Sequence, residues 1–335
     1  MARFMSNKIF ILSEKEIKSL VHLDLNIIAE IEKAFVALAK GEVEMPPILS
    51  MEMKDQRGEV DVKTAYIKNF DGFAVKISPG FFNNPSLGLP SLNGLMILFS
   101  SKTGLVQSLL LDNGYLTDIR TAAAGAISIK YLSNQKTKSL GIIGSGLQAR
   151  LQAQAACLVR KFETITVWGR DQLKAEKCAE DIKQITKLDC KVELDIQKVV
   201  KENEVLITTT PSKEFLIKES WIQKGQHITA MGSDNSEKNE IDPNIFKSID
   251  LFVPDRNSQS KKLGELRTAI KNKIVKENDT FPELGNIIVD PKLGRSNENQ
   301  ITLCDLTGTG VQDTAIATLT DKLAKEKNIG KIIEN

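Results

Sequence analysis

Hydrophobic residues recur with helical spacing near the start of the chain. Apolar side chains after Asp24 fall on one face of a helix that ends at Gly41: Ile27, Ile28, Ile31, Phe35 and Leu38. Asp24 is placed to cap this helix, and Ser13 with Glu16 has the spacing of a capping box for a shorter helix, 14–21. The pattern therefore predicts that the chain opens with two helices.

From about residue 60 the pattern changes to that of β-strands. Short runs of apolar and β-branched residues predict strands at 60–67, 73–78, 94–100 and 105–111. The turn residues 101–104 join the last two runs, which predicts an antiparallel pair. The stretch 79–93 is rich in glycine, proline and asparagine, and we interpret it as a loop too polar and broken for a regular element.

Beyond residue 117 strands alternate with helices. An alanine-rich helix, 118–132, with Thr117 as its cap, is predicted to lead into a second domain. Strands are then expected at 139–143, 164–168, 205–209, 227–231 and 250–253, with helices at 148–160 and 171–186. Such alternation is typical of a parallel sheet with helices on both faces.

These elements predict an α/β protein of two domains. Residues 125–305 are expected to form a Rossmann-type doubly wound parallel sheet. Residues 1–124 with 306–335 are expected to form an α+β domain, to which a last helix, 310–325, returns. The length of 335 residues agrees with this division, because single cores rarely exceed about 250–300 residues.

The net charge of the chain bears on whether it binds nucleic acid or an anionic membrane. Lys and Arg number 45 and Asp and Glu number 43, so the net charge is only +2. Nucleic-acid and anionic-membrane binding depend on a basic excess, so we expect neither partner. No apolar run is long enough to span a bilayer.

Histidine and cysteine usage excludes several kinds of site. The two histidines, His22 and His227, are interpreted as structural, and a histidine-rich metal site cannot be built from them, so no metal is expected. The four cysteines show no Cys-x-x-Cys spacing, and the first residues lack a signal-peptide pattern. Both observations favour a cytoplasmic protein with reduced thiols.

The most specific motif lies between the strand 139–143 and the helix that follows it. A dinucleotide fingerprint of the form G-x-G-x-x-A occupies six residues: Gly144, Ser145, Gly146, Leu147, Gln148 and Ala149. The first glycine allows a tight turn, and the second lets the backbone approach a pyrophosphate at the start of the helix. The motif predicts that NAD(P) binds here.

The end of the next strand bears on the choice between NAD and NADP. The position that often holds an acidic residue for the ribose hydroxyl falls on Gly169-Arg170-Asp171. Arg170 could clamp a 2′-phosphate, lie along the adenine or be solvated, while Asp171 could still reach the ribose. We favour NADP and leave NAD open.

Several further motifs together resemble one known family. The segments 73–76, 113–124, 141–149, 231–234 and 305–308 are similar, in this order, to the ornithine cyclodeaminase/mu-crystallin family. Residues 62–66 and 78–82 look most like its branch of ectoine-utilisation cyclodeaminase homologues and iminosuccinate reductase. The resemblance spans nearly the whole chain and implies a homodimer whose first domain binds substrate and dimerises.

The resemblance also places roles on individual residues. It implies that Lys76 is the active-site lysine, that Arg120 holds the substrate α-carboxylate, and that Asp234 is the catalytic aspartate beside the nicotinamide. With no histidine to use, proton transfer falls to such Lys and Asp side chains. Weaker candidates are Ser91 and Asn93 for the substrate, and, for the cofactor, Thr121, Thr209, Thr210, Met231 and Gly232.

Two departures from the family pattern bear on the substrate. Ile48 stands where ornithine-handling members have an arginine, and Lys63 falls on the glutamate that holds the distal amine of ornithine. A lysine there favours a carboxylate over an ammonium group. We therefore expect an NAD(P)-dependent imine reductase or amino-acid dehydrogenase for a small acidic α-imino acid such as iminosuccinate. An ornithine cyclodeaminase-type enzyme and a non-catalytic NADP-binding protein are the alternatives.

Overall fold

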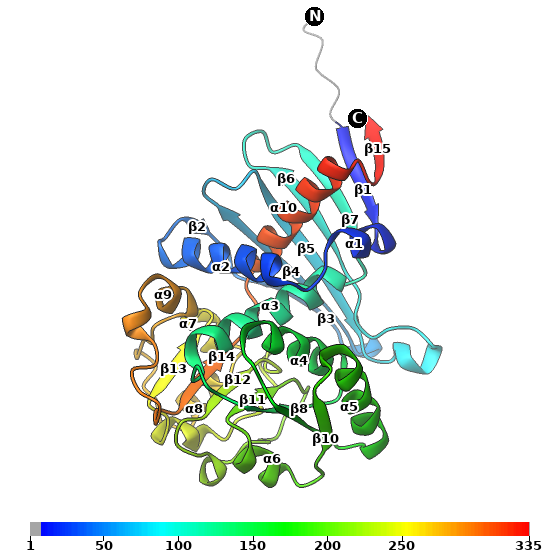
Figure 1. The fold of residues 1–335 in the computed structure, drawn as a ribbon. Coiled ribbons are helices and arrows are strands. Elements are labelled where there is room, and N and C mark those ends of the chain that lie inside the picture. The colour runs from blue at the N-terminus through cyan, green and yellow to red at the C-terminus, as the bar shows by residue number, and fades with distance from the viewer. Residues whose placement is uncertain (1–7, 335) are drawn as a thin grey trace, which may run out of the picture. The chain divides into compact units, whose positions relative to one another are not determined.

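The computed structural model describes residues 8–334, which form two compact units. The first unit contains the residues up to Arg120 together with those from Thr309 on, and the second is Thr121–Gly308 (Figure 1). The predicted division, after residues 124 and 305, falls a few positions from these boundaries.

The first unit is built on one mixed sheet. Its strand order is β15 (Lys331–Glu334), β1 (Lys8–Ser13), β7 (Val106–Leu111), β6 (Leu95–Ser100), β5 (Gly72–Phe81), β4 (Gly58–Ile67) and β2 (Val43–Glu44), with β3 (Leu49–Met53) also paired to β4. The four predicted strands are confirmed as the antiparallel series β4 to β7. The prediction that the chain opens with helices is wrong, because the first described element is the strand β1, which pairs with β7 and β15.

The predicted loop 79–93 is also partly wrong. β5 continues to Phe81, because its backbone keeps pairing with β4 as far as Gly58, and a short 3₁₀-helix, η2 (Asn84–Leu87), follows. A second such turn, η1 (Lys54–Gln56), precedes β4. The first residues of this segment are therefore extended despite their composition, because pairing with β4 holds them in place.

Helices α1 (Glu14–Leu20), α2 (Leu25–Ala39) and α10 (Gly310–Lys327) belong to the same unit. The predicted caps of the first two are confirmed: Ser13 and Glu16 form a capping box, and Asp24 accepts a hydrogen bond of 2.9 Å from the Ile27 N–H. α10 packs on β4, β5 and α2 (Figure 1). This helix brings residues from the far end of the sequence onto the sheet.

Helix α3 (Tyr115–Leu132) begins earlier than predicted and spans the boundary between the units. Thr117 is not its cap. The carboxylate of Asp112 accepts the Leu116 N–H at 2.8 Å, which satisfies a free donor of the first turn. A carboxylate at the positive end of the helix dipole is the stronger cap here.

The second unit contains the predicted parallel sheet. Its seven strands run in the order β10 (Asp189–Val192), β9 (Thr164–Trp168), β8 (Ser139–Ile143), β11 (Val205–Thr208), β12 (His227–Ala230), β14 (Thr302–Asp305) and β13 (Leu251–Pro254). Its helices are α4 (Leu147–Val159), α5 (Gln172–Thr186), α6 (Ile196–Glu202), α7 (Asn257–Ser260), α8 (Leu266–Lys271) and α9 (Leu284–Val289), with 3₁₀ turns η3 (Glu219–Trp221), η4 (Pro243–Lys247) and η5 (Pro291–Leu293). The α/β fold class is confirmed.

Successive residues of these strands bury opposite faces of the sheet. Ile142 and Ile207 pack into one hydrophobic layer with α4 and α5, while their neighbours Ile143 and Leu206 pack into a second layer with α6 and α8. The order of the strands reverses between β8 and β11, so the carboxyl ends of these two strands form the switch point where ligands bind in such sheets.

His227 is buried in the second unit. Its ring nitrogens lie 2.8–3.0 Å from the hydroxyls of Ser128, Thr229 and Thr302. Burial, with Arg295 and Arg160 nearby, holds the pKa of this imidazole well below its usual value. These contacts are those of a neutral structural histidine. Within residues 8–334, no helix combines the length and apolarity needed to cross a membrane.

Candidate active site

Two lysines lie opposite each other on adjacent strands of the sheet of the first unit. Lys63 on β4 and Lys76 on β5 are direct cross-strand partners, and their relative exposures are 8% and 2%. Like charges directly opposite one another destabilise a sheet. The pair therefore needs a nearby anion to offset its repulsion.

Asp313 on α10 supplies that anion. Its carboxylate lies 3.1 Å from Lys76 Nζ, and it also accepts a hydrogen bond of 3.0 Å from Arg120 Nε. Gln312, on the same helix turn, accepts a second hydrogen bond of 3.2 Å from Arg120 Nη1. The structure thus brings the predicted residues Lys76 and Arg120 together on one buried carboxylate.

Burial tunes the proton affinities in this cluster. Loss of solvation, together with the charges of Arg120 and Lys63, lowers the pKa of Lys76 to about 7 against the opposing effect of Asp313. Burial alone would raise the pKa of Asp313, but Arg120, Lys76 and Lys63 together hold it below its usual value. A lysine that gains and loses a proton near neutral pH suits acid–base chemistry.

Asp112 adds a second acidic group near the cluster. It is buried at the start of α3, and desolvation raises its pKa to about 6, while the backbone N–H groups it accepts and the charge of Lys76 act in the opposite direction. The carboxyl group therefore caps α3 within reach of the charge of Lys76.

Ser91 and Asn93 lie on the segment that returns alongside the end of β5. The Ser91 carbonyl accepts the Phe81 N–H at 2.7 Å, and the Asn93 N–H donates to the Pro79 carbonyl at 3.0 Å. The Asn93 side chain accepts the N–H of Gly94. The structure uses these residues to hold the strand end, and their contact with substrate stays a prediction.

In the second unit, the glycine loop has the geometry that a dinucleotide needs. Gly144 has φ of 130°, and a Cβ there would collide with the Thr209 hydroxyl. α4 begins after Gly146, which as its N-cap makes no side-chain hydrogen bond to the helix. Arg150 Nη1 donates to the carbonyls of Ser145 and Gly146 at 2.8 and 2.9 Å, which fixes the loop. Because Gly146 at the N-cap carries no side chain, the backbone at the start of α4 is open to the close approach of a pyrophosphate.

Gly169, Arg170 and Asp171 follow the end of β9, as the sequence predicted, but the Asp171 carboxylate is partly engaged. Gly169 packs against Ser145, where a Cβ would lie 3.0 Å from the hydroxyl. Arg170 is exposed. Asp171 accepts the Lys174 N–H at 3.0 Å as the N-cap of α5, so one of its oxygens is already engaged.

The remaining candidates for the cofactor surround the switch point. Thr209 and Thr210 follow β11, and Met231 and Gly232 follow β12. The Thr121 carbonyl accepts a hydrogen bond of 3.1 Å from Gln152 on α4. All of these lie in the same unit as the glycine loop.

Asp234 lies in the loop after β12 and is about half exposed. Its carboxylate forms an ion pair of 2.6 Å with Lys238, whose side chain is largely buried. Sequence reasoning did not single out Lys238, although a spacing of four residues is a common one for such pairs in a short loop or helix. It also missed Asp313, Gln312 and Asp112, for which the available signal was a polar residue inside an otherwise buried run.

Comparison with known proteins gives whole-chain matches. A family model described as the ornithine cyclodeaminase/mu-crystallin family matches residues 7–328. An uncharacterized cyclodeaminase, y4tK, of Sinorhizobium fredii is 51% identical over 97% of this chain and 98% of its own length.

Solved structures agree over the same extent. An archaeal alanine dehydrogenase dimer with bound NAD has a TM-score of 0.90 at 30% identity, covering 97% of this chain and 99% of its own. The iminosuccinate reductase of Paracoccus denitrificans in complex with NAD⁺ has a TM-score of 0.89 at 28% identity, covering 99% of this chain and all of its own.

Proposed function

The chain belongs to the ornithine cyclodeaminase/mu-crystallin family, and we propose that it reduces a small dicarboxylic α-imino acid of the iminosuccinate type. The family membership, the NAD(P)-dependent enzyme class and the fold class that the motifs indicated are confirmed. The choice of an acidic substrate is supported by one observation, the buried cations Lys63, Lys76 and Arg120 gathered about Asp313.

The charges of this cluster favour an anionic substrate. Arg120 and Lys63 both act on Lys76 strongly enough to lower its pKa, which means that the site has a positive potential. A carboxylate beside Lys63 would relieve the repulsion between the two opposed lysines. An ammonium group, such as the distal amine of ornithine, would add to it.

Arg120 is prepared to hold the α-carboxylate. Asp313 and Gln312 fix its guanidinium through Nε and Nη1, so the planar fork keeps one orientation. Arginine forks bind carboxylates in a bidentate manner, which would place the imine carbon reproducibly. In this proposal Lys63 binds the second carboxylate of the substrate.

Proton transfer falls to Lys76 and Asp234. A nicotinamide cofactor, when bound, would supply the hydride for the carbon of the protonated C=N bond. Asp234 would stabilise the positive charge on that nitrogen before transfer. Lys76 Nζ would then give a proton to the new amine, which leaves the site as an ammonium group. A pKa near neutrality lets the lysine recover this proton from water.

We propose NADP as the preferred cofactor. Arg170 is exposed at the end of β9, whereas Asp171 already caps α5 with one oxygen. An arginine fork can bind a 2′-phosphate, and an engaged carboxylate is a weaker partner for a ribose hydroxyl.

We also propose a homodimer. Large apolar side chains are exposed on β3 and on the segment after β5, among them Leu49 at 62%, Met51 at 54% and Leu92 at 63%. Leu49 and Met51 are two residues apart on β3 and so point to the same face of the strand, and exposed apolar side chains gathered in this way are typical of an interface. Light scattering would test it: Leu49→Asp with Met51→Asp should give a monomer, and an unchanged mass would contradict this interface.

A cyclodeaminase is the second candidate, since the relative of 51% identity carries that name. Such an enzyme would oxidise a diamino acid, let the distal amine attack the imine and release ammonia. The same Lys76 and Arg120 would serve, so only the substrate separates the two functions.

The deciding experiment follows NADPH or NADH oxidation with ammonia and a panel of 2-oxo acids, and NAD(P)⁺ reduction or ammonia release with ornithine. We expect the highest kcat/KM with oxaloacetate plus ammonia, and aspartate as the product. Oxaloacetate without ammonia is the control for simple ketone reduction. Faster turnover of ornithine, or of the imine of pyruvate, would overturn the acidic-substrate proposal.

A further inference from the structure

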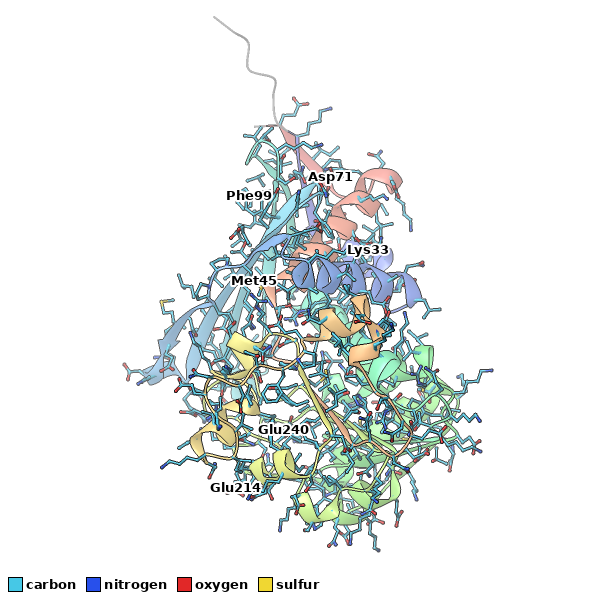
Figure 2. The ribbon with its side chains drawn as sticks, turned by 90° about the vertical axis from the view of Figure 1, so that its left-hand side faces the viewer. Lys33, Met45, Asp71, Phe99, Glu214 and Glu240 are labelled. Atoms are coloured by element: carbon cyan, nitrogen blue, oxygen red, sulfur yellow. The ribbon has the colours of Figure 1, made fainter. Side chains whose placement is uncertain are left out.

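A single buried carboxylate ties together the ends of two strands in the second unit. Glu240 is fully buried, and its two oxygens accept hydrogen bonds from the hydroxyls of Thr208 and Thr210 and from the backbone N–H groups of Thr210 and Gly232. Thr208 ends β11, and Gly232 follows β12. Figure 2 labels Glu240 among the side chains of this unit.

Glu240 closes the base of the loop that carries Asp234. The loop runs from Gly232, just after β12, to Glu240. Its two ends are joined by a hydrogen bond of 2.8 Å from the Gly232 N–H to the Glu240 carboxylate. A Cβ on Gly232 would lie 2.5 Å from Glu240 Cδ, so the glycine is needed for this approach. The position of the loop relative to the sheet therefore depends on the Glu240 carboxylate.

Contacts inside the loop transmit that position to Asp234. The Ser233 hydroxyl lies 2.8 Å from the Lys238 carbonyl, and the Asn235 side chain accepts the Lys238 N–H at 3.1 Å. Lys238 in turn pairs with Asp234 at 2.6 Å. The loop is thus closed on itself and tied to the ends of β11 and β12 through Glu240, while Ser233 also donates to the Leu263 carbonyl and Arg267 to the Lys238 carbonyl.

A second buried carboxylate supports the first. Glu265 accepts the Glu240 N–H at 2.9 Å and the Ile241 N–H at 3.2 Å. The Glu265 N–H donates to Asp305 at the end of β14. Burial raises the pKa of Glu240, while its four hydrogen bonds favour the ionised form.

We propose that Glu240 is a positioning residue, which sets the place of Asp234 by clamping its loop to the ends of β11 and β12. The inference rests on the proposed role of Asp234 in imine reduction. It goes beyond that role, since Glu240 acts through the loop and touches neither substrate nor cofactor in this scheme.

The test variant is Glu240→Gln. In either orientation of the amide, its NH₂ group faces one of the two backbone N–H groups, of Thr210 or Gly232, and neither can turn away. We expect kcat to fall about 10–100-fold, as for a displaced catalytic group, with KM changed much less. Thr208→Val removes only one hydroxyl donor, keeps the side-chain shape and should give a smaller loss of the same kind.

A double-mutant cycle separates positioning from general damage. If Glu240 acts through Asp234, Glu240→Gln should have little further effect on kcat in an Asp234→Asn background. Independent, multiplying losses would overturn the proposal. Glu204→Gln is the matched control. Glu204 accepts hydrogen bonds from the N–H groups of Lys138 and Ser139 at the amino-terminal end of β8, the end of the strands opposite to the Asp234 loop. This variant should leave kcat unchanged.

Hydrogen exchange gives a readout that needs no activity. Amides of residues 233–239 should exchange faster in Glu240→Gln than in the unaltered protein, while those of β8 and β9 stay unchanged. Unchanged exchange in the loop would refute the clamp. If the loop loosens but the unaltered protein reduces no imine, the clamp stands and the proposed function fails.

Discussion

Replacing Lys76 by methionine should make the protein more stable at neutral pH while it abolishes imine reduction. Burial lowers the pKa of Lys76 from 10.5 to about 7. At about 1.4 kcal/mol per pH unit, holding this lysine in place costs on the order of 4 kcal/mol at neutral pH. Methionine has a similar unbranched stem and no charge, but it leaves Asp313 with one cation fewer. Asp313 keeps its hydrogen bond from Arg120, so we expect a net gain smaller than this cost, about 1–4 kcal/mol.

The pH dependence gives this prediction its sign. Between the folded and unfolded pKa values, the unfolded chain binds more protons at Lys76 than the folded chain does, so the stability of the unaltered protein rises with pH there. The variant lacks this contribution. Its advantage should be largest below the folded pKa, shrink by about 1.4 kcal/mol per pH unit above it, and vanish above the unfolded pKa.

Urea unfolding followed by circular dichroism at several pH values from neutral to about pH 9.5 would measure the effect. Lys102→Met is the matched control, because the Lys102 side chain is 81% exposed and should show no such trend. An advantage of Lys76→Met that does not change with pH would refute the reasoning, as would a variant less stable than the unaltered protein at neutral pH.

Three further changes address the charges and the cofactor. Asp313→Asn removes the anion that raises the pKa of Lys76, so the pH–rate profile for reduction should move to lower pH by about 1–3 units, and an unmoved profile would contradict the pairing. Lys63→Met should lower kcat/KM for oxaloacetate plus ammonia about 10-fold or more beyond its effect on pyruvate plus ammonia, and equal losses would show that Lys63 does not bind the second carboxylate. Arg170→Ser should weaken NADPH binding about 10–100-fold and NADH binding about twofold or less, measured by fluorescence titration, and equal effects would argue against a 2′-phosphate clamp.

The fold of the second unit could be predicted from local sequence patterns. The glycine fingerprint and the alternation of strands and helices are set by neighbouring residues, and the parallel sheet with its uncapped α4 follows from them. In the first unit the antiparallel strands β4 to β7 were also accessible, because each has the spacing of a strand. The strand β1 and the edge strand β15 were not, since pairing with a neighbour decides whether such short runs are extended.

The anion of the lysine cluster could not be found by spacing. Asp313 is separated from Arg120 by 193 positions, and only the packing of α10 on β4 and β5 brings them together. The available signal was chemical: an aspartate in the continuously buried first turns of a helix must have cationic partners. The predicted cap of α3 was wrong because Thr117 fits the residue preference for a cap but lies inside the helix, which begins earlier and whose Leu116 N–H binds the Asp112 carboxylate.

The return of α10 to the first unit has a consequence for biosynthesis. The second unit is one continuous segment, Thr121–Gly308, and can fold as soon as it leaves the ribosome. The sheet that holds Lys63 and Lys76 is made earlier, yet it lacks its covering helix and the Asp313 carboxylate until residues 310–327 have been translated. The first part of the chain to be synthesised is therefore the last to be completed, and a ribosome stalled before residue 310 would leave two opposed lysines without this counter-ion.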